Sequence, residues 1–328
     1  MIALAMLERS GLIDGLGDAD REDACTAFKP FNLGAGEEVF AEQEQDRTLG
    51  VVLEGTLVAT LSRTKVGVVG PGETIGEMAM FGSLDRRSVT LTTESPVALL
   101  LLDGDGLRQL RLRDNPVAQR LEVQAMRTIA QRLRATNERI GTMAEGDRVI
   151  EPTGRGLVTR IAESLGLVGK RPTTQEPLAS AVLRNTPGFT PRDDAVLQRL
   201  AARFRAVAVR DRETIIREGE PGNDAFIVAE GRLAVYRSVD EGRAERVAVL
   251  GPGHIVGAVA LADKDARSAT VRAVAPSWLL RISHDDYRAL ETDLGAEGRT
   301  FRRGMIDAMS AQLRLANEHI LRQTRDPR

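Results

Sequence analysis

An internal duplication constrains the fold of this chain more than any other feature of its sequence. The tripeptide Gly-Pro-Gly at 70–72 recurs at 251–253, and the dipeptide Arg-Ser at 87–88 recurs at 267–268. The later segments "AQRLRATNERI" and "AQLRLANEHI" keep about the same spacing. A shared order of landmarks at an offset of 180 or 181 positions is the signature of a tandem repeat, in which each copy is one structural unit. We therefore expect two domains of the same fold.

Each copy has the same predicted plan of secondary structure. Helical segments come first, at 18–28 and at 190–204. Short strands follow, separated by turn residues about every eight to twelve positions, as in "VAVRDRETIIREGEPGNDAFIVAEGRLAVYRS". This rhythm is typical of a small antiparallel sandwich or barrel. A long helix then closes the copy, at 115–140 in the first case.

Composition and charge narrow the class of protein. The chain has 328 residues, which is enough for about two domains that each bury a core. Hydrophobic residues make up 42% and charged residues 28%, as in a folded globular protein rather than a disordered one. The net charge is −2, so the chain lacks the broad basic field with which proteins bind the phosphate backbone of DNA.

Metal, disulfide and membrane functions find no support in the sequence. Cys25 is the single cysteine, which excludes an intramolecular disulfide, and we expect it to be a small buried residue. His254, His284 and His319 are scattered without metal-ligand spacing, so we expect no metal. The start, "MIALAMLERSGLIDG", is too short and too soon charged for a signal peptide or a membrane span. A cytoplasmic location is expected.

The segment "IGEMAMFGSLDRRSVT" at 75–90 carries the residues with the clearest chemistry. Gly76, with the small Ala79 nearby, lets backbone N–H groups approach an anion closely. Arg87 would add two charge-assisted hydrogen bonds, each contributing about 1.5–3 kcal/mol when shielded from water. A phosphate alone does not need the carboxylate of Glu77, whereas a sugar phosphate offers hydroxyl donors to it. The loop therefore predicts a ribose-phosphate site, with a plain Glu77–Arg87 ion pair as the alternative.

These features together resemble the cyclic nucleotide-binding domain family, which includes the bacterial cAMP receptor protein and the regulatory subunits of protein kinase A. The resemblance covers nearly the whole chain in two copies. It implies an α+β fold, in which each copy is a jelly-roll-like β-roll with N-terminal helices and a long C-terminal helix. The implied boundaries are 1–141 for the first domain, 142–177 for a connecting helix and linker, and 178–328 for the second domain.

The same resemblance implies cAMP or cGMP as the ligand of the first copy. Carried over position by position, the phosphate-binding cassette of the family corresponds to Gly76, Glu77, Met78, Ala79, Arg87 and Ser88. The resemblance assigns the ribose 2′-hydroxyl to Glu77 and the cyclic phosphate to Arg87. In the closing helix, Thr136 and Asn137 take the positions that contact the purine base. An ordinary solvent-facing role for these two residues is the alternative.

The second copy departs from this pattern at two positions together. Ala258 stands in place of Glu77, and Ala316 in place of Thr136. The candidates for a second site are Gly257, Ala258, Ala260, Arg267, Ser268 and Asn317. Loss of about 3 kcal/mol of sugar and base contacts would weaken binding more than a hundredfold. We therefore expect a degenerate second domain, which binds a different anion or serves as a packing partner.

The closing helices carry apolar stripes that need a partner surface. The stripe of the first helix consists of Val117, Leu121, Met126, Ile129, Leu133 and Ile140, and that of the second of Met305, Met309, Leu313, Ala316 and Ile320. Each stripe can pack on its own β-roll, on the other helix, or on the same helix of a second chain. The family resemblance favours helix pairing, within the chain or in a homodimer.

A non-catalytic sensor of cyclic nucleotide, acting on an unknown protein partner, is the function that the sequence predicts. The chain shows no nucleophile elbow, Walker loop or histidine motif, so we expect no enzyme activity. Two alternatives stay open. One is a transcription regulator that has lost its DNA-binding domain, since no helix-turn-helix follows either closing helix. The other is a regulatory subunit that masks a partner enzyme.

Overall fold

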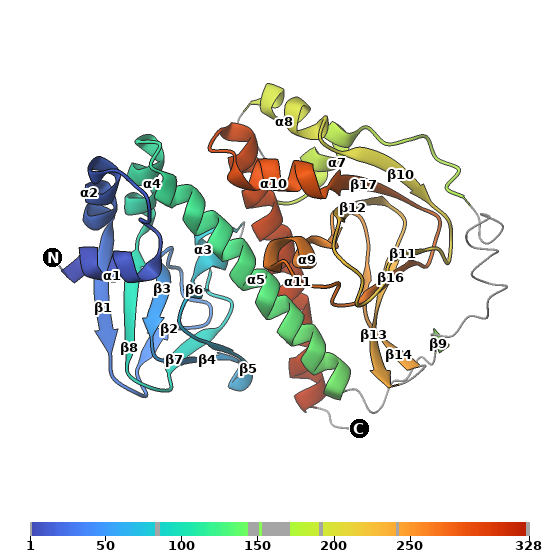
Figure 1. Ribbon diagram of the computed structural model, residues 1–328. Helices are drawn as coiled ribbons and strands as arrows, with labels where there is room; N and C mark the ends of the chain where they lie inside the picture. The colour runs from blue at the N-terminus through green and yellow to red at the C-terminus, as the bar shows by residue number, and fades with distance from the viewer. Residues whose placement is uncertain are drawn as a thin grey trace. The chain divides into compact units, whose positions relative to one another are not determined.

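A computed structural model describes residues 2–82, 86–143, 151–152, 171–189, 193–240 and 243–325 (Figure 1). The chain divides into two compact units. The first consists of Met1–Ile129 together with Asn317–Asp326, and the second of Ala130–Ala316 together with Pro327–Arg328. Each unit contains two β-sheets from one copy of the repeat and the helices that flank them.

The first unit is a β-roll preceded by the helices α1 (Ile2–Ser10) and α2 (Asp18–Ala27). Its strands are β1 (Phe28–Leu33), β2 (Glu38–Phe40), β3 (Leu49–Glu54), β4 (Leu57–Leu61), β5 (Thr64–Val69), β6 (Thr74–Ile75), β7 (Thr90–Thr93) and β8 (Val97–Leu102). They pair antiparallel in two sheets of order β1-β8-β3-β6 and β2-β7-β4-β5. The predicted α+β, jelly-roll-like fold is confirmed.

The core of this unit lies between its two sheets. Alternate residues of β7 are buried, as expected of a strand with one face on the core. Phe40 of β2 and Leu57 of β4 meet Val52 of β3 and Leu99 of β8 in one hydrophobic cluster. Each such side chain contributes about 1.5–3 kcal/mol through removal of its apolar surface from water. The cassette loop begins at β6, at the edge of this core.

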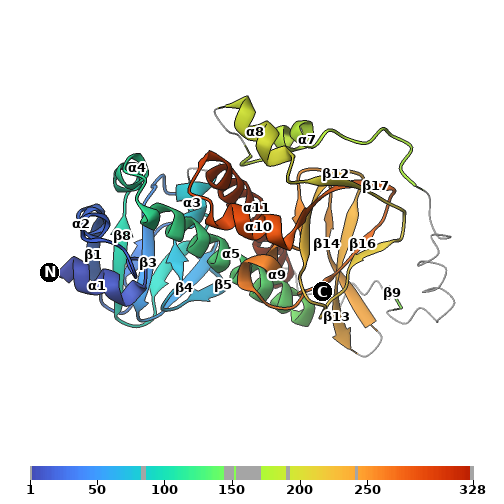
Figure 2. The ribbon, with the colours of Figure 1, turned by 45° about the horizontal axis from the view of Figure 1, so that its top comes forward.

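The second unit repeats the plan strand for strand. Its elements before the closing helices are α7 (Ala179–Asn185), α8 (Asp194–Ala201), β10 (Arg205–Val209), β11 (Thr214–Ile216), β12 (Asp224–Glu230), β13 (Leu233–Asp240), β14 (Arg243–Leu250), β15 (Ile255–Val256), α9 (Ala258–Asp263), β16 (Thr270–Ala273) and β17 (Ser277–Ser283). One sheet has the order β10-β17-β12-β15, and the other has β11-β16-β13-β14 with β9 (Glu151–Pro152) added at its edge. Figure 2 labels β12 and β17 of the first of these sheets and β13, β14 and β16 of the second. The duplication predicted from the sequence is therefore confirmed in the topology.

Two helices follow the last strand of each copy. They are α4 (Gly104–Leu112) and α5 (Pro116–Met143) in the first copy, and α10 (His284–Thr292) and α11 (Ala296–Arg325) in the second. Asp103 and Ser283 cap α4 and α10, because their side-chain oxygens accept from backbone N–H groups of the first turn. The apolar stripe predicted for α5 is buried. Both α5 and α11 have one part in each compact unit.

The connecting helix predicted at 154–167 falls outside the described residues, as does most of the predicted linker before residue 171. In the part of the chain that the structure describes, no helix combines the length and the apolar character that crossing a bilayer requires.

Candidate cyclic nucleotide site

The first cassette starts at a glycine turn that no other residue fits. Gly76 follows β6 directly and has φ of 76°, in the left-handed region that side chains disfavour. A Cβ atom on this residue would collide with Nη1 of Arg87 and with the carbonyl oxygen of Thr48. The turn therefore brings the backbone of the loop directly against the arginine, as the sequence predicted for a close-approach site.

A short helix, α3 (Glu77–Phe81), carries the other predicted cassette residues of the first part of the loop. Glu77 is its first residue and is 1% exposed, and Ala79 is buried as well. Met78 is half-buried and accepts a hydrogen bond at 3.5 Å from the hydroxyl of Ser88, at the far end of the loop. The structure thus brings both ends of the predicted motif together; residues 83–85 between them lie outside the described part.

Arg87 is held through its backbone and through one edge of its guanidinium group. Its N–H donates to the carbonyl of Glu44 and its carbonyl accepts from the N–H of Gln43, both at 2.9 Å. Nη2 donates to the Thr48 carbonyl at 2.9 Å and to the carboxylate of Asp46. The side chain is 3% exposed, so this cation is buried with a carboxylate beside it.

The plane of the guanidinium group is set by an aromatic ring. Its central carbon lies 3.5 Å from the centroid of the Phe40 ring, a cation–π distance. Nε and Nη1, in contrast, are buried and find no hydrogen-bond partner among the described residues. Buried donors are nearly always paired in proteins, so these two unpaired donors on a cation are chemically able to bind an anion.

Asp46 responds to this cation. Burial alone would raise the pKa of its carboxyl group, but hydrogen bonds from Thr48 and Arg87 and the charge of Arg87 outweigh burial and hold the pKa below its ordinary value. Asp46 is therefore ionised at neutral pH and compensates the charge of Arg87.

The second cassette has the same backbone and different partners for its arginine. Gly257 has φ of 82° and precedes α9 (Ala258–Asp263), in which Ala258 and Ala260 are buried. Arg267 donates from Nη1 to the Gly257 carbonyl at 2.8 Å, and from Nη2 to the carbonyl and the carboxylate of Asp224 at 2.8 and 2.7 Å. Burial lowers the pKa of Arg267 despite the charge of Asp224.

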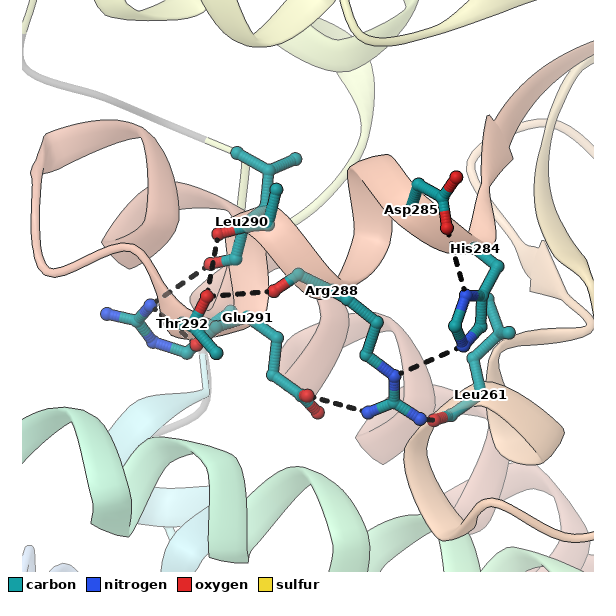
Figure 3. A network of polar contacts seen from close by, with 9 residues as sticks. Leu261, His284, Asp285, Arg288, Leu290, Glu291 and Thr292 are labelled. Atoms are coloured by element: carbon teal, nitrogen blue, oxygen red, sulfur yellow. Dashed lines mark hydrogen bonds and ion pairs between the residues drawn. The ribbon is translucent and has the colours of Figure 1, made fainter.

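Polar contacts also fasten the second cassette to the strands and helices around it. Asp224 accepts a further hydrogen bond from Nε of Arg281 at 2.9 Å, and the carbonyl of Ser268 accepts from Arg237. Figure 3 shows Arg288 of α10, which donates to the carbonyl of Leu261 in α9 at 2.7 Å and to the Glu291 carboxylate at 2.6 Å. The cassette helix is thereby tied to α10, the helix that directly follows β17.

The family model of the cyclic nucleotide-binding domain matches residues 30–114 and 206–292. Together, these segments make up more than half of the chain. This chain is a member of the cyclic nucleotide-binding domain family. Each matched segment runs from the first strand of a β-roll to the helix after its last strand and includes one cassette.

Characterised members of the family include bacterial regulators. The cyclic AMP receptor protein of Thermus thermophilus is 36% identical over 76 residues, which are 23% of this chain and 35% of that protein. The CRP-like cAMP-activated global transcriptional regulator of Mycobacterium tuberculosis H37Rv is 26% identical over 204 residues, covering 58% of this chain and 80% of the regulator. The chain thus spans about a third of the length of the first relative and most of the second.

Solved structures of family members resemble the chain at low sequence identity. The cAMP complex of the regulatory domain of Toxoplasma gondii protein kinase A has 18% identity and a TM-score of 0.32, covering 88% of this chain and 90% of that one. A cyclic nucleotide-binding domain from Methylobacillus flagellatus has 18% identity and a TM-score of 0.41, covering 49% and 85%.

The residues that the family resemblance assigns to the purine base lie on the closing helices. Thr136 is 6% exposed and Asn137 is half-buried, in the part of α5 that belongs to the second compact unit. Asn317 is 9% exposed, in the part of α11 that belongs to the first unit. Their roles in base recognition stay predictions.

Sequence reasoning missed the residues that hold the two cassette arginines. Phe40 and Asp46 contact Arg87 from more than forty positions away, and Asp224 contacts Arg267 in the same way. No motif announces them. The repeat offers one signal. When the two copies are aligned at Gly55 and Gly231, the loop before β3 contains Asp46 and the corresponding loop before β12 leads to Asp224, at a position that does not match.

Proposed function

We propose that the first unit binds a cyclic purine nucleotide, cAMP or cGMP, and that the chain acts as a non-catalytic regulatory protein. The observation that carries the proposal is the state of Arg87. This cation is 3% exposed, is fixed by Asp46 and Phe40, and keeps Nε and Nη1 without partners among the described residues, beside the Gly76 turn. A phosphate oxygen on these two donors completes the site.

Each cassette residue has a chemical role in this proposal. Arg87 binds the cyclic phosphate through two charge-assisted hydrogen bonds, supported by backbone N–H groups of the turn. Glu77, buried at the start of α3, accepts a hydrogen bond from the ribose 2′-hydroxyl. Thr136 and Asn137 offer a hydroxyl and an amide to the base, with which cAMP and cGMP are told apart.

The second unit, we infer, does not bind cyclic nucleotide as the first does. Ala258 offers no acceptor to a ribose hydroxyl, and Arg267 already donates to Gly257 and Asp224. A phosphate would have to displace these protein acceptors, and the displaced groups would lose buried hydrogen bonds worth about 1–3 kcal/mol each. The second β-roll then serves as a structural and signalling partner.

The regulatory output is assigned to the long helices. Helix α5 follows the first β-roll and ends among residues of the second unit. A ligand that binds one arrangement of α5 more tightly than another shifts the population of the two, and the shift is limited by the difference in affinity. A second copy of the chain, paired through these helices, or another protein would receive the signal.

Calorimetric titration of the full chain with cAMP and with cGMP tests the proposal. We expect one site per chain in the unaltered protein and in Arg267→Met. Loss of the two hydrogen bonds in Arg87→Met should weaken binding at least about a hundredfold. Arg87→Lys, which keeps the charge without the planar fork, should bind with intermediate affinity.

Two results would contradict the proposal in different ways. Binding that survives in Arg87→Met and disappears in Arg267→Met would move the site to the second unit. An absence of heat and of thermal stabilisation with either nucleotide would leave a family member whose cassette takes another ligand. Circular dichroism of each variant shows whether a lost signal reflects unfolding.

A further inference from the structure

We propose that Phe40 is a positioning residue for ligand binding: its ring holds the plane of the Arg87 guanidinium group and takes up neither Nε nor Nη1, which are left for the ligand. The inference rests on the proposed function, because the ligand atoms concerned are the phosphate oxygens of a cyclic nucleotide. Phe40 lies on β2, 47 positions before Arg87, and belongs to no sequence motif of the cassette.

The geometry places three kinds of group around Arg87. The Phe40 ring lies against one face of the guanidinium group, with 3.5 Å between its centroid and the central carbon. Asp46 and the Thr48 carbonyl take the Nη2 edge. The remaining edge, with Nε and Nη1, adjoins the Gly76 turn, where a Cβ atom would collide with Nη1. The ring thus holds the plane of the guanidinium group, and the two acceptors on Nη2 hold its rotation within that plane.

An aromatic face has a property that carbonyl and carboxylate groups lack. It attracts a cation through the negative potential above the ring and accepts none of the cation's in-plane N–H donors. An arginine that is oriented only by hydrogen-bond acceptors uses one of its N–H donors for every acceptor that it contacts. Phe40 therefore stabilises the orientation of Arg87 and leaves the two donors of the open edge for the phosphate.

The second copy shows the alternative arrangement within the same fold. The position of Phe40 on β2 corresponds to Ile216 on β11, since Phe40 pairs with Leu91 of β7 and Ile216 with Val271 of β16. Both side chains belong to the core clusters of their β-rolls. An aliphatic residue thus fills this core position equally well, so core packing alone does not require a ring.

The two arginines differ as this reasoning predicts. Beside Ile216, Arg267 donates from Nη1 to the Gly257 carbonyl, which closes the edge that faces the glycine turn. Beside Phe40, the same edge of Arg87 is open among the described residues. The aromatic residue and the open arginine occur together in the first copy, and the aliphatic residue and the engaged arginine occur together in the second.

The test compares Phe40→Ile, which copies the second unit, with Phe40→Tyr, which keeps the ring. Phe28→Ile is the matched control. Phe28 on β1 is another buried phenylalanine of the same unit, and among the described residues no arginine or lysine stacks on its ring. Each variant of the full chain is titrated with cAMP, alone and in an Arg87→Met background. The Arg87 Nε–H proton of the ligand-free protein is followed by NMR.

We expect Phe40→Ile to weaken cAMP binding about fivefold to thirtyfold, the range of one desolvated cation–π contact. Phe40→Tyr and Phe28→Ile should stay within about twofold of the unaltered chain. In the Arg87→Met background, Phe40→Ile should have no further effect, because its role acts through the arginine. The Nε–H signal should carry an upfield ring-current shift that disappears in Phe40→Ile and persists in Phe40→Tyr.

Unchanged affinity in Phe40→Ile, or an equal loss with and without Arg87, would overturn the inference and leave the proposed function standing. A similar loss in Phe28→Ile would reduce Phe40 to a core residue. If the unaltered chain binds neither nucleotide, the proposed function fails first. The NMR shift then reports only the contact between Phe40 and Arg87. The role of Phe40 in phosphate binding is refuted together with the proposed function.

Discussion

The two cassette arginines are buried cations with the same backbone setting and different compensation. Removal of a guanidinium group from water is costly unless charge and hydrogen bonds replace its hydration. Arg87 receives Asp46, one backbone carbonyl and the ring of Phe40, whereas Arg267 receives Asp224 and two backbone carbonyls. The first arrangement leaves donors open and the second uses them. At the residue scale, this difference is the basis on which we propose a binding site in the first copy and a structural contact in the second.

The role of Gly76 can be tested by comparison with a second glycine of positive φ, at which an added Cβ atom would meet no other atom. Gly72 has φ of 86°, and a Cβ atom there would meet nothing within 4 Å. Gly72→Ala should cost about 1–2 kcal/mol of stability from left-handed strain and leave cAMP affinity unchanged. Gly76→Ala should add a collision with Arg87 and lower affinity at least about tenfold. Calorimetry and thermal unfolding measure the two effects, and equal affinities in both variants would contradict the geometry described for the turn.

The sequence predicted the local part of this site and missed the distant part. Gly76, Glu77, Arg87 and Ser88 are recognisable because they lie within one loop and keep a fixed spacing. Asp46 pairs with Arg87 across 41 positions, and a strand register decides which side chain of β2 faces the arginine. Such pairings depend on how two sheets stack, which local patterns of residues do not encode.

At the scale of secondary-structure elements, the residues at the junction of the last two helices have reversed charges in the two copies. In the first copy, Arg111 of α4 pairs with Glu122 of α5 at 2.5 Å, and the glutamate is 3% exposed. At the equivalent positions the second copy has Glu291 on α10 and Arg302 on α11. Arg302 is fully buried and donates to carbonyls at the C-terminal end of α10. A cation at this end of a helix also stabilises its dipole.

Charge reversal at the first pair tests whether the two arrangements are interchangeable. Arg111→Glu places two carboxylates together, one of them buried, and should destabilise the first unit by about 2 kcal/mol. The double variant Arg111→Glu/Glu122→Arg copies the second unit and should recover most of that loss. Chemical denaturation of both variants, beside Arg108→Glu as an exposed control on the same helix, gives the measurement. If the double variant is less stable than the single one, the residues around the pair accept an arginine only on α4 and a glutamate only on α5.

The fold itself followed from the sequence more completely than the site did. The repeat, the turn-separated strands and the apolar stripe of α5 predicted two small antiparallel sandwiches or barrels with long closing helices, and the family resemblance implied β-rolls, as observed. These features depend on periodicity along the chain, which burial imposes directly. No periodic pattern in the sequence, in contrast, indicates to which compact unit each part of a long helix belongs. Residues from Ala130 in α5 belong to the second unit, and residues from Asn317 in α11 belong to the first.

At the scale of the whole molecule, each unit therefore includes residues that the other copy of the repeat contributes. The end of α11 supplies buried side chains to the first unit, among them Ile320, which is 0% exposed. Within the second unit, Arg134 of α5 forms a two-point ion pair with Asp263 of α9, at 2.7 and 3.0 Å. Neither unit is complete within its own copy, so separation of the copies should remove packing from both.

Two isoleucines of the same helix test this division. Ile320 lies in the part of α11 that belongs to the first unit, and Ile306, also 0% exposed, lies in the part that belongs to the second. Each substitution by alanine should cost about 2–5 kcal/mol in its own unit. Hydrogen exchange read by mass spectrometry should show faster exchange in β3 and β8 for Ile320→Ala, and in β12 and β17 for Ile306→Ala. If Ile320→Ala accelerates exchange only in the strands of the second unit, the end of α11 does not stabilise the first β-roll. In that case the first copy folds around its own closing helix.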